Sequence, residues 1–303
     1  MVNIWVAPTD FGWFDFLSKQ GPLDEVNFWQ PSGNKQFRAI QEGELFVFKL
    51  KAPFNKIAGF GVFARATLLP LTLAWQTFGL KNGHATLEEM RQSIQRYKRE
   101  ATETIGFRVI TQPVFWPRSR WIDPPSNWAA EITSGKRYST EDAEGLRLWN
   151  ALNIAVPDRP RGSPGLSEPA PVLFGKPQRI RPRLGQGAFR VGVIDIYNKR
   201  CAVTGEKTLP ALEAAHIQPV AGNGGHELSN GLLLRRDLHA LFDQHYVSID
   251  ENMNFVVSKR IKEEFENGRE YYSLHGKKIA EPAEERYRPS RMALEKHRSL
   301  FLG

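Results

Sequence analysis

The 303-residue sequence contains very little cysteine and no long apolar run. Cys201 is the only cysteine, which excludes an internal disulfide and any zinc knuckle built from several cysteines. A chain without disulfides suits a reducing compartment, so we expect a cytoplasmic protein. No run of about 18 apolar residues occurs, and no basic segment followed by an apolar one opens the chain, so neither a membrane span nor a signal peptide is expected.

The residues that are present predict a two-domain globular protein. Hydrophobic residues make up 41% of the chain and charged residues 24%, which is ordinary for folded proteins. All eight tryptophans lie within residues 1–150, whereas seven prolines lie within residues 157–187. Proline-rich segments are extended and semi-rigid. The sequence therefore predicts one domain over 1–150, a basic linker over 151–188 and a second domain over 189–303.

The net charge of +8 is unevenly distributed. Residues 1–150 carry 18 basic and 15 acidic residues, residues 151–190 carry 7 and 2, and residues 191–303 carry 16 of each. Most of the excess therefore lies in and around the linker. A basic segment of this kind favours a polyanion such as nucleic acid. We predict that Arg179, Arg181 and Arg183 follow a phosphate backbone.

Four polar residues of the second domain have a spacing that suits phosphodiester hydrolysis. His216 lies in a strand-like apolar run, Asn230 follows 14 residues later, and His239 and Asp243 are four residues apart in a helical pattern. Residues at i and i+4 share one helix face, where an imidazole and a carboxylate can hold one divalent cation. His216 is then the candidate general base, and Asn230 the group that orients it.

Two arginines follow the second strand directly, and either Arg235 or Arg236 is predicted to hold a flanking phosphate. The predicted local order is strand, turn, strand, helix.

These residues belong to four blocks that occur in order: Cys201-Ala-Val-Thr-Gly205, Glu213-Ala-Ala-His-Ile217, Asn230-Gly-Leu-Leu-Leu-Arg235 and Asp237-Leu-His-Ala-Leu-Phe-Asp243. Together they resemble the HNH endonuclease family, over roughly residues 190–260. The resemblance implies a ββα-metal fold, His216 as catalytic base, Asn230 as the central asparagine and His239 as a metal ligand. Asp243 falls where some relatives place a further metal-binding histidine.

The resemblance departs from the family pattern at one position. Many members have Asp or His as a metal ligand directly before the base, where this chain has Ala215. The expected site is therefore His239 and Asp243 with water and substrate phosphate, around one divalent cation such as Mg²⁺ or Mn²⁺. Glu213 lies on the same strand face as Ala215 and is the alternative contributor. No structural zinc is expected, since the paired cysteines of some relatives are missing.

The first half contains Trp5, the turn Phe28-Trp-Gln-Pro-Ser-Gly33, and the runs Gly43-Glu-Leu-Phe-Val-Phe48 and Gly59-Phe-Gly-Val-Phe63. Over roughly residues 1–130, this pattern resembles PUA-like modules of the EVE and ASCH groups, which implies a small β-barrel with flanking helices. Such modules often bind nucleic acid, and some hold a flipped, modified base. A flipped base needs aromatic faces and a few polar groups. Trp29, Gln30, Ser32 and Asn34 supply both kinds and form the candidate base pocket. The alternative is that the tryptophans are simply core residues. The expected fold class is thus α+β in both halves.

Together these features predict an endonuclease that cuts double-stranded DNA carrying 5-methyl- or 5-hydroxymethylcytosine. One HNH site cuts one strand, so a homodimer is expected for duplex cleavage, and no membrane partner is expected. Two alternatives stay open. The first is an HNH nuclease without modification preference, acting against phage DNA or as a toxin. The second is a nucleic-acid-binding module whose nuclease has decayed.

Overall fold

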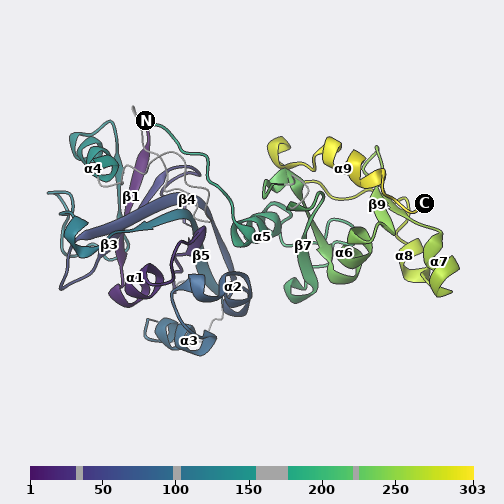
Figure 1. Ribbon diagram of the computed structural model, residues 1–303, viewed down its shortest axis with the longest axis horizontal. Coiled ribbons are helices and arrows are strands. Elements are labelled where there is room, and N and C mark those ends of the chain that lie inside the picture. The colour runs from purple at the N-terminus through teal and green to yellow at the C-terminus, as the bar shows by residue number, and fades with distance from the viewer. Residues whose placement is uncertain (32–36, 98–103, 155–176, 221–224) are drawn as a thin grey trace. The chain divides into compact units, whose positions relative to one another are not determined.

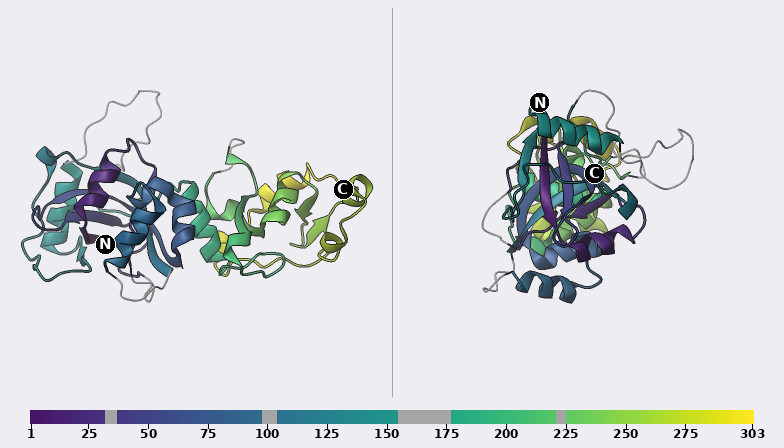
Figure 2. Two further views of the ribbon diagram at one scale, coloured as in Figure 1. Left: turned by 90° about the horizontal axis from the view of Figure 1, so that it is seen from below. Right: turned by 90° about the vertical axis from the view of Figure 1, so that its left-hand side faces the viewer.

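The computed structural model describes residues 1–31, 37–97, 104–154, 177–220 and 225–303. The chain forms two compact units, Met1–Ala188 and Phe189–Gly303. Colours run from purple to teal along the first unit and on through green to yellow along the second (Figure 1, Figure 2). The expected α+β class is confirmed. In the part of the chain that the structure describes, no helix has the length and apolar content needed to cross a membrane.

A six-stranded sheet forms the centre of the first unit, with the strand order β2-β5-β4-β3-β1-β6. Strand β1 pairs parallel with β3, and the other neighbours are antiparallel. The strands are β1 (Asn3–Thr9), β2 (Glu25–Asn27), β3 (Leu45–Leu50), β4 (Ile57–Pro70), β5 (Thr104–Phe115) and β6 (Lys136–Ser139). The apolar runs around residues 44–50 and 57–64 form β3 and β4. Residues 107–110 and 114–116 belong to one long strand, β5.

The small closed barrel expected for the first unit is wrong. In the described residues, β2 and β6 are the two edges of the sheet and are not hydrogen-bonded to each other. Both are short, with three and four residues. The six residues of β3 are all buried, which requires cover on both faces of the sheet. A layered open sheet with two cores therefore replaces a barrel with one interior.

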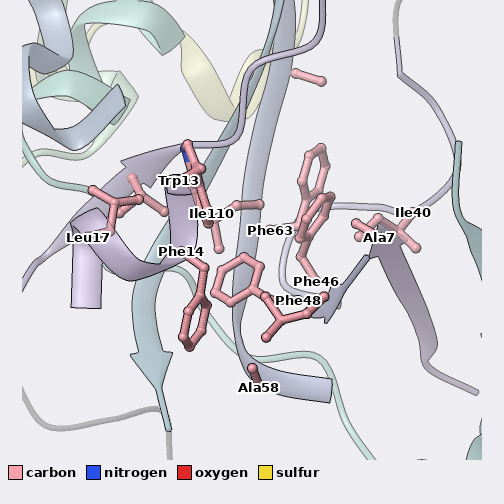
Figure 3. Packing of buried hydrophobic residues seen from close by; sticks show 13 residues of the cluster. Ala7, Trp13, Phe14, Leu17, Ile40, Phe46, Phe48, Ala58, Phe63 and Ile110 are labelled. Carbon is pink, nitrogen blue, oxygen red and sulfur yellow. The ribbon is translucent and has the colours of Figure 1, made fainter. Parts of the chain in front are cut away.

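The two cores occupy opposite faces of this sheet. Ile4 of β1 and Val47 of β3 pack in one core with Trp149 of α4 (Ala143–Ile154). The other core joins Phe46 and Phe48 to Trp13 and other apolar residues of α1 (Phe11–Ser18) (Figure 3). The alternation along β1 and β3 divides neighbouring residues between the two cores.

Two further helices follow β4. Helix α2 (Leu71–Phe78) continues directly from it. Helix α3 (Leu87–Gln95) begins after Thr86, whose side chain accepts a hydrogen bond from the Glu89 backbone amide at 3.1 Å. Residues 98–103 lie outside the described part of the chain.

The proline-rich segment is described only at its ends. Helix α4 reaches Ile154, and helix α5 (Gln186–Ile196) begins at Gln186. Residues 155–176 lie outside the described residues. From 177 the chain is extended along the first unit, where the Ile180 amide donates to the Gly43 carbonyl at 2.9 Å.

The second unit contains a strand–loop–strand–helix segment. Strands β7 (Leu212–His216) and β8 (Gly231–Arg235) pair antiparallel, and α6 (Arg236–Asp243) follows β8 without a loop. A second hairpin joins β9 (Val247–Ile249) to β10 (Phe255–Val257). The remaining helices are α7 (Arg260–Phe265), α8 (Arg269–Tyr272) and α9 (Arg291–Arg298). This arrangement confirms the local order predicted for residues 212–243.

Gly59 of β4 provides a test of the sheet register. A Cβ at this position would lie 2.1 Å from the Val114 carbonyl oxygen of β5, a rigid backbone atom. We expect Gly59→Ala to lower the free energy of unfolding of the first unit by about 2 kcal/mol or more. Urea unfolding followed by tryptophan fluorescence measures this.

Gly12→Ala in helix α1 is the matched control. Nothing lies within 4 Å of a Cβ placed there. Alanine in a helix is favoured over glycine by roughly 0.5–1 kcal/mol, so this variant should be slightly more stable than the parent. Equal stability of the two variants would contradict the register described.

Candidate functional site

The pairing of β7 with β8 brings Glu213 into contact with His239, 26 positions later in the sequence. His216 ends β7 opposite Gly231, and Glu213 lies opposite Leu234 near the end of β8. Helix α6 starts directly after β8 and buries Leu238 and Phe242. The opposite face of α6, which carries His239 and Asp243, is thereby presented to Glu213 of β7.

His239 lies between two carboxylates. Its Nδ1 is 2.8 Å from Glu213 Oε2, and its Nε2 is 3.2 Å from Asp243 Oδ2. Glu213 Oε1 is also 3.0 Å from Nε of Arg236. A carboxylate on one ring nitrogen of a histidine fixes the tautomer and leaves the other nitrogen for a metal. Glu213 therefore orients His239, and His239 and Asp243 lie side by side.

His239 and Asp243 of α6 fit a metal cation that takes only a few of its ligands from the protein. Among the described residues, no three His, Cys, Asp or Glu side chains form a complete metal-binding group. His239 and Asp243 supply one nitrogen and one carboxylate on one helix face. Mg²⁺ is commonly bound by one or two carboxylates with water and phosphate oxygens in the remaining positions. The pair fits such a cation, and Glu213 contacts the other ring nitrogen of His239.

His216 is held in a partly buried environment of rings. Its imidazole stacks on Phe189 with ring centres 3.9 Å apart and planes 8° apart. Its Nε2 lies 3.1 Å from Nδ1 of His226. Burial lowers the pKa of His216 to about 4, and the neighbouring His226 and His239 add to the lowering. The imidazole is therefore neutral at neutral pH and free to accept a proton.

Asn230 fixes the chain that follows His216. Its Oδ1 accepts from the Gln218 amide at 3.0 Å, and its Nδ2 donates to the carbonyls of Gln218 and Gly225 at 2.9 and 3.1 Å. Its own carbonyl accepts from the Ile217 amide at 2.8 Å. Asn230 is buried, so these bonds are protected from water. It thus positions His216 through the backbone of the following residues.

The two arginines expected to hold phosphate have different partners. Arg235 forms a two-pronged ion pair with Asp237, whose shorter contact joins Nη2 to Oδ2 at 2.5 Å. Arg236 contacts Glu213 as described above. Phosphate binding by Arg235 or Arg236 stays a prediction. Of the two, Arg236 lies nearer to the candidate site, because Glu213 contacts both Arg236 and His239.

Two residues of the site, Phe189 and Arg190 of α5, escaped the sequence reasoning. A third residue, His226, comes from the loop before β8 and contacts His216. Burial lowers the pKa of Arg190, while the charge of Glu213 raises it and that of Arg236 lowers it. Nε of Arg190 is buried without a hydrogen-bond partner in the described residues. The Phe-Arg pair ahead of the cysteine block was the only available signal, and it is weak.

The candidate base pocket of the first unit is described in part. The Trp29 indole nitrogen donates to the Asn82 carbonyl at 3.0 Å, and its ring lies 5.7 Å from that of His84. The Gln30 side chain accepts a hydrogen bond from Arg108. Ser32 and Asn34 lie outside the described residues. Trp29 is packed against the core of the α1 face, and its contact with a base stays a prediction.

The three arginines expected to follow a phosphate backbone are all exposed. Arg179 lies 3.9 Å from the buried carboxylate of Glu44, and Arg181 and Arg183 follow on the same extended segment. Their contact with DNA stays a prediction.

One family model matches part of the second unit. Residues 201–250 match a family model described as HNH endonuclease, and this range holds β7, β8 and α6. No curated protein matches the chain.

Three solved structures were compared with the chain. It is similar to ASCH from Zymomonas mobilis, at 14% identity over 47% of this chain and 94% of that one, with a TM-score of 0.32. A point mutant of that protein gives 14% identity, 48% and 96% coverage, and the same TM-score. The modification-dependent TagI restriction endonuclease gives 15% identity over 92% of this chain and 76% of that one, with a TM-score of 0.28.

His297 provides a pH test of the second unit. It is buried, its Nε2 is 2.9 Å from the Phe242 carbonyl oxygen and its Nδ1 2.9 Å from the Ser248 hydroxyl. Burial lowers its pKa to about 4. The unfolded chain, with an ordinary pKa near 6.5, then binds more protons between these values, so stability falls as pH falls. We expect a loss of about 3 kcal/mol between pH 7 and pH 4 from this residue.

Urea unfolding at a series of pH values, followed by far-ultraviolet circular dichroism, measures this loss. Tryptophan fluorescence reports only the first unit, since all eight tryptophans lie within residues 1–150, and serves as the internal control. His297→Gln removes the titrating group and should flatten the pH dependence of the second transition, leaving the contribution of His216. Identical slopes for parent and variant would refute the assignment.

Proposed function

We propose that the protein is a metal-dependent DNA endonuclease, with its active site on β7 and α6 of the second unit. The observation that carries this proposal is the meeting of His216, Asn230, His239 and Asp243 on one strand–strand–helix segment that matches the HNH family model. His239 and Asp243 would hold the cation, Mg²⁺ or Mn²⁺. When bound, such a cation stabilises charge on the scissile phosphate and on the leaving oxygen.

Residues of the chain would supply the other functions of the site, which are proton abstraction, positioning and contact with phosphate. The neutral imidazole of His216 takes a proton from the attacking water. Phe189 and His226 hold the ring, and Asn230 holds the backbone beyond it. Glu213 keeps His239 in one tautomer. Arg236 and Arg190 supply positive charge for phosphate oxygens, with Glu213 balancing them in the free protein.

We further propose that the first unit directs the nuclease to DNA with modified cytosine. Support comes from a sheet face rich in aromatic rings that also carries polar groups at Gln30 and Arg108. Aromatic faces replace the stacking that an extruded base loses. The basic segment of Arg179, Arg181 and Arg183 would add contacts to the phosphate backbone that do not depend on sequence. Duplex cleavage by single HNH sites implies a homodimer or two enzymes acting together.

Replacement of the base tests the nuclease assignment. General base catalysis contributes roughly 10²–10⁴-fold in rate. We expect His216→Ala to reduce Mg²⁺- or Mn²⁺-supported cleavage of modified DNA by about 100-fold or more, measured by nicking of supercoiled plasmid. His275→Asn is the matched control, because His275 is exposed in the same unit and its ring bonds to the Val257 amide instead. Undiminished cleavage by His216→Ala would remove His216 from the mechanism.

Modified plasmids test the role of the first unit. Plasmids of one sequence are prepared with cytosine, 5-methylcytosine or 5-hydroxymethylcytosine. Cleavage is expected only of a modified plasmid, and the His216→Ala variant tests for contaminating nucleases. Equal cleavage of all three would leave an HNH nuclease without modification preference, and cleavage of none with any divalent cation would favour a binding module.

A further inference from the structure

Arg108 of β5 is a cation enclosed by the apolar face of the first sheet. Its relative exposure is 6%, and its guanidinium carbon lies 4.4 Å from the ring centre of Phe37 and 5.9 Å from that of Phe28. Burial lowers the pKa of Arg108 to about 10, so the group is still charged at neutral pH. Burying a charge is costly unless it is paired.

The partners of Arg108 do not balance this charge. In the described residues, its side chain makes one hydrogen bond, from Nη2 to the neutral amide oxygen of Gln30, and no ion pair with a carboxylate. Its Nε is buried and has no partner among those residues. A guanidinium has five N–H donors in a fixed plane. Among the described residues, donors of the Arg108 guanidinium therefore remain without an acceptor.

In the described residues, the sheet register places two small residues next to Arg108. Arg108 pairs with Ala66 of β4, and Gly106, two residues before it on the same face, pairs with Gln30 through both backbone bonds. Ala66 and Gly106 are therefore described neighbours of Arg108 on this face of the sheet, and the rings of Phe37 and Phe28 lie against its guanidinium. A flat ring that stacks on aromatic side chains and turns an edge of acceptors toward Arg108 has the complementary chemistry.

We propose that Arg108 reads the Watson–Crick edge of an extruded cytosine, donating to the adjacent acceptors O2 and N3, while Gln30 holds the guanidinium in plane. This inference rests on the proposed uptake of a modified cytosine by the first unit, and it adds the residue that recognises the base itself. Thymine presents an N3–H donor at the same place, which would oppose a donor of Arg108. The base is thus selected at its ring edge, separately from the group at C5.

Binding to three duplexes of one sequence tests this assignment. The central base opposite guanine is 5-methylcytosine, cytosine or thymine. The full chain carries His216→Ala and is assayed in chelator, so that the DNA stays intact. A good bidentate contact discriminates roughly 10- to 100-fold between bases. We expect 5-methylcytosine to be bound that much more tightly than thymine, although the mismatched thymine is cheaper to extrude.

Two substitutions then isolate Arg108. Arg108→Gln should reduce the preference for 5-methylcytosine over thymine to about threefold or less, and Arg108→Lys, which keeps the charge without the planar fork, should lose most of it. The melting temperature of Arg108→Gln should be unchanged or raised, because a buried unpaired charge is removed. Arg91→Gln is the matched control, since Arg91 is a partly exposed arginine of α3 that forms an ion pair with Glu88.

The failures are distinguishable. Equal binding of 5-methylcytosine and cytosine by the parent would refute modification dependence, which is part of the proposed function. An unchanged preference for 5-methylcytosine over thymine in Arg108→Gln, with or without a loss of stability, would overturn the role of Arg108. An equal loss of affinity for all three duplexes would also overturn it, because that result indicates a phosphate contact.

Discussion

The hydrogen bonds of Asn230 are the constraint on which the candidate active site depends. They close the backbone between the end of β7 and the start of β8, so His216 has a fixed position relative to the strand that leads into α6. Without this closure, a one-residue slip in the pairing would turn Glu213 away from His239. A buried amide with all its bonds made is well suited to this task, since breaking any one would leave a polar group unsatisfied.

Two histidines of the second unit show that a lowered pKa alone does not mark a functional group. Burial lowers the pKa of both His216 and His297 to about 4. His297 has partners on both ring nitrogens, the Phe242 carbonyl and the Ser248 hydroxyl. His216 has a hydrogen-bond partner on Nε2 alone among the described residues. Both ring nitrogens of His297 are thus hydrogen-bonded, whereas His216 keeps one nitrogen for the proton transfer proposed above.

The sequence predicted what is local and missed what depends on tertiary contact. The pair of His239 and Asp243 follows from helical spacing, and β3 follows from its apolar run. The contact between Glu213 and His239 depends on the β7–β8 register, and the ring of Phe189 reaches His216 from a separate helix. The prediction of a barrel was wrong because an apolar strand covered on both faces, such as β3, has the same composition as a strand of a closed barrel.

Arg108 illustrates the same limit in the first unit, since an arginine in a strand is ordinarily an exposed residue. Its burial costs stability, and substitution by an apolar or neutral side chain is often favourable at such positions. Residues that are placed unfavourably for folding, with no stabilising partner nearby, are concentrated at functional sites. Residues 191–303 carry no net charge, with 16 basic and 16 acidic residues. Selectivity for a base would then come from one buried cation, whereas affinity for the backbone would come from the exposed arginines before Gln186.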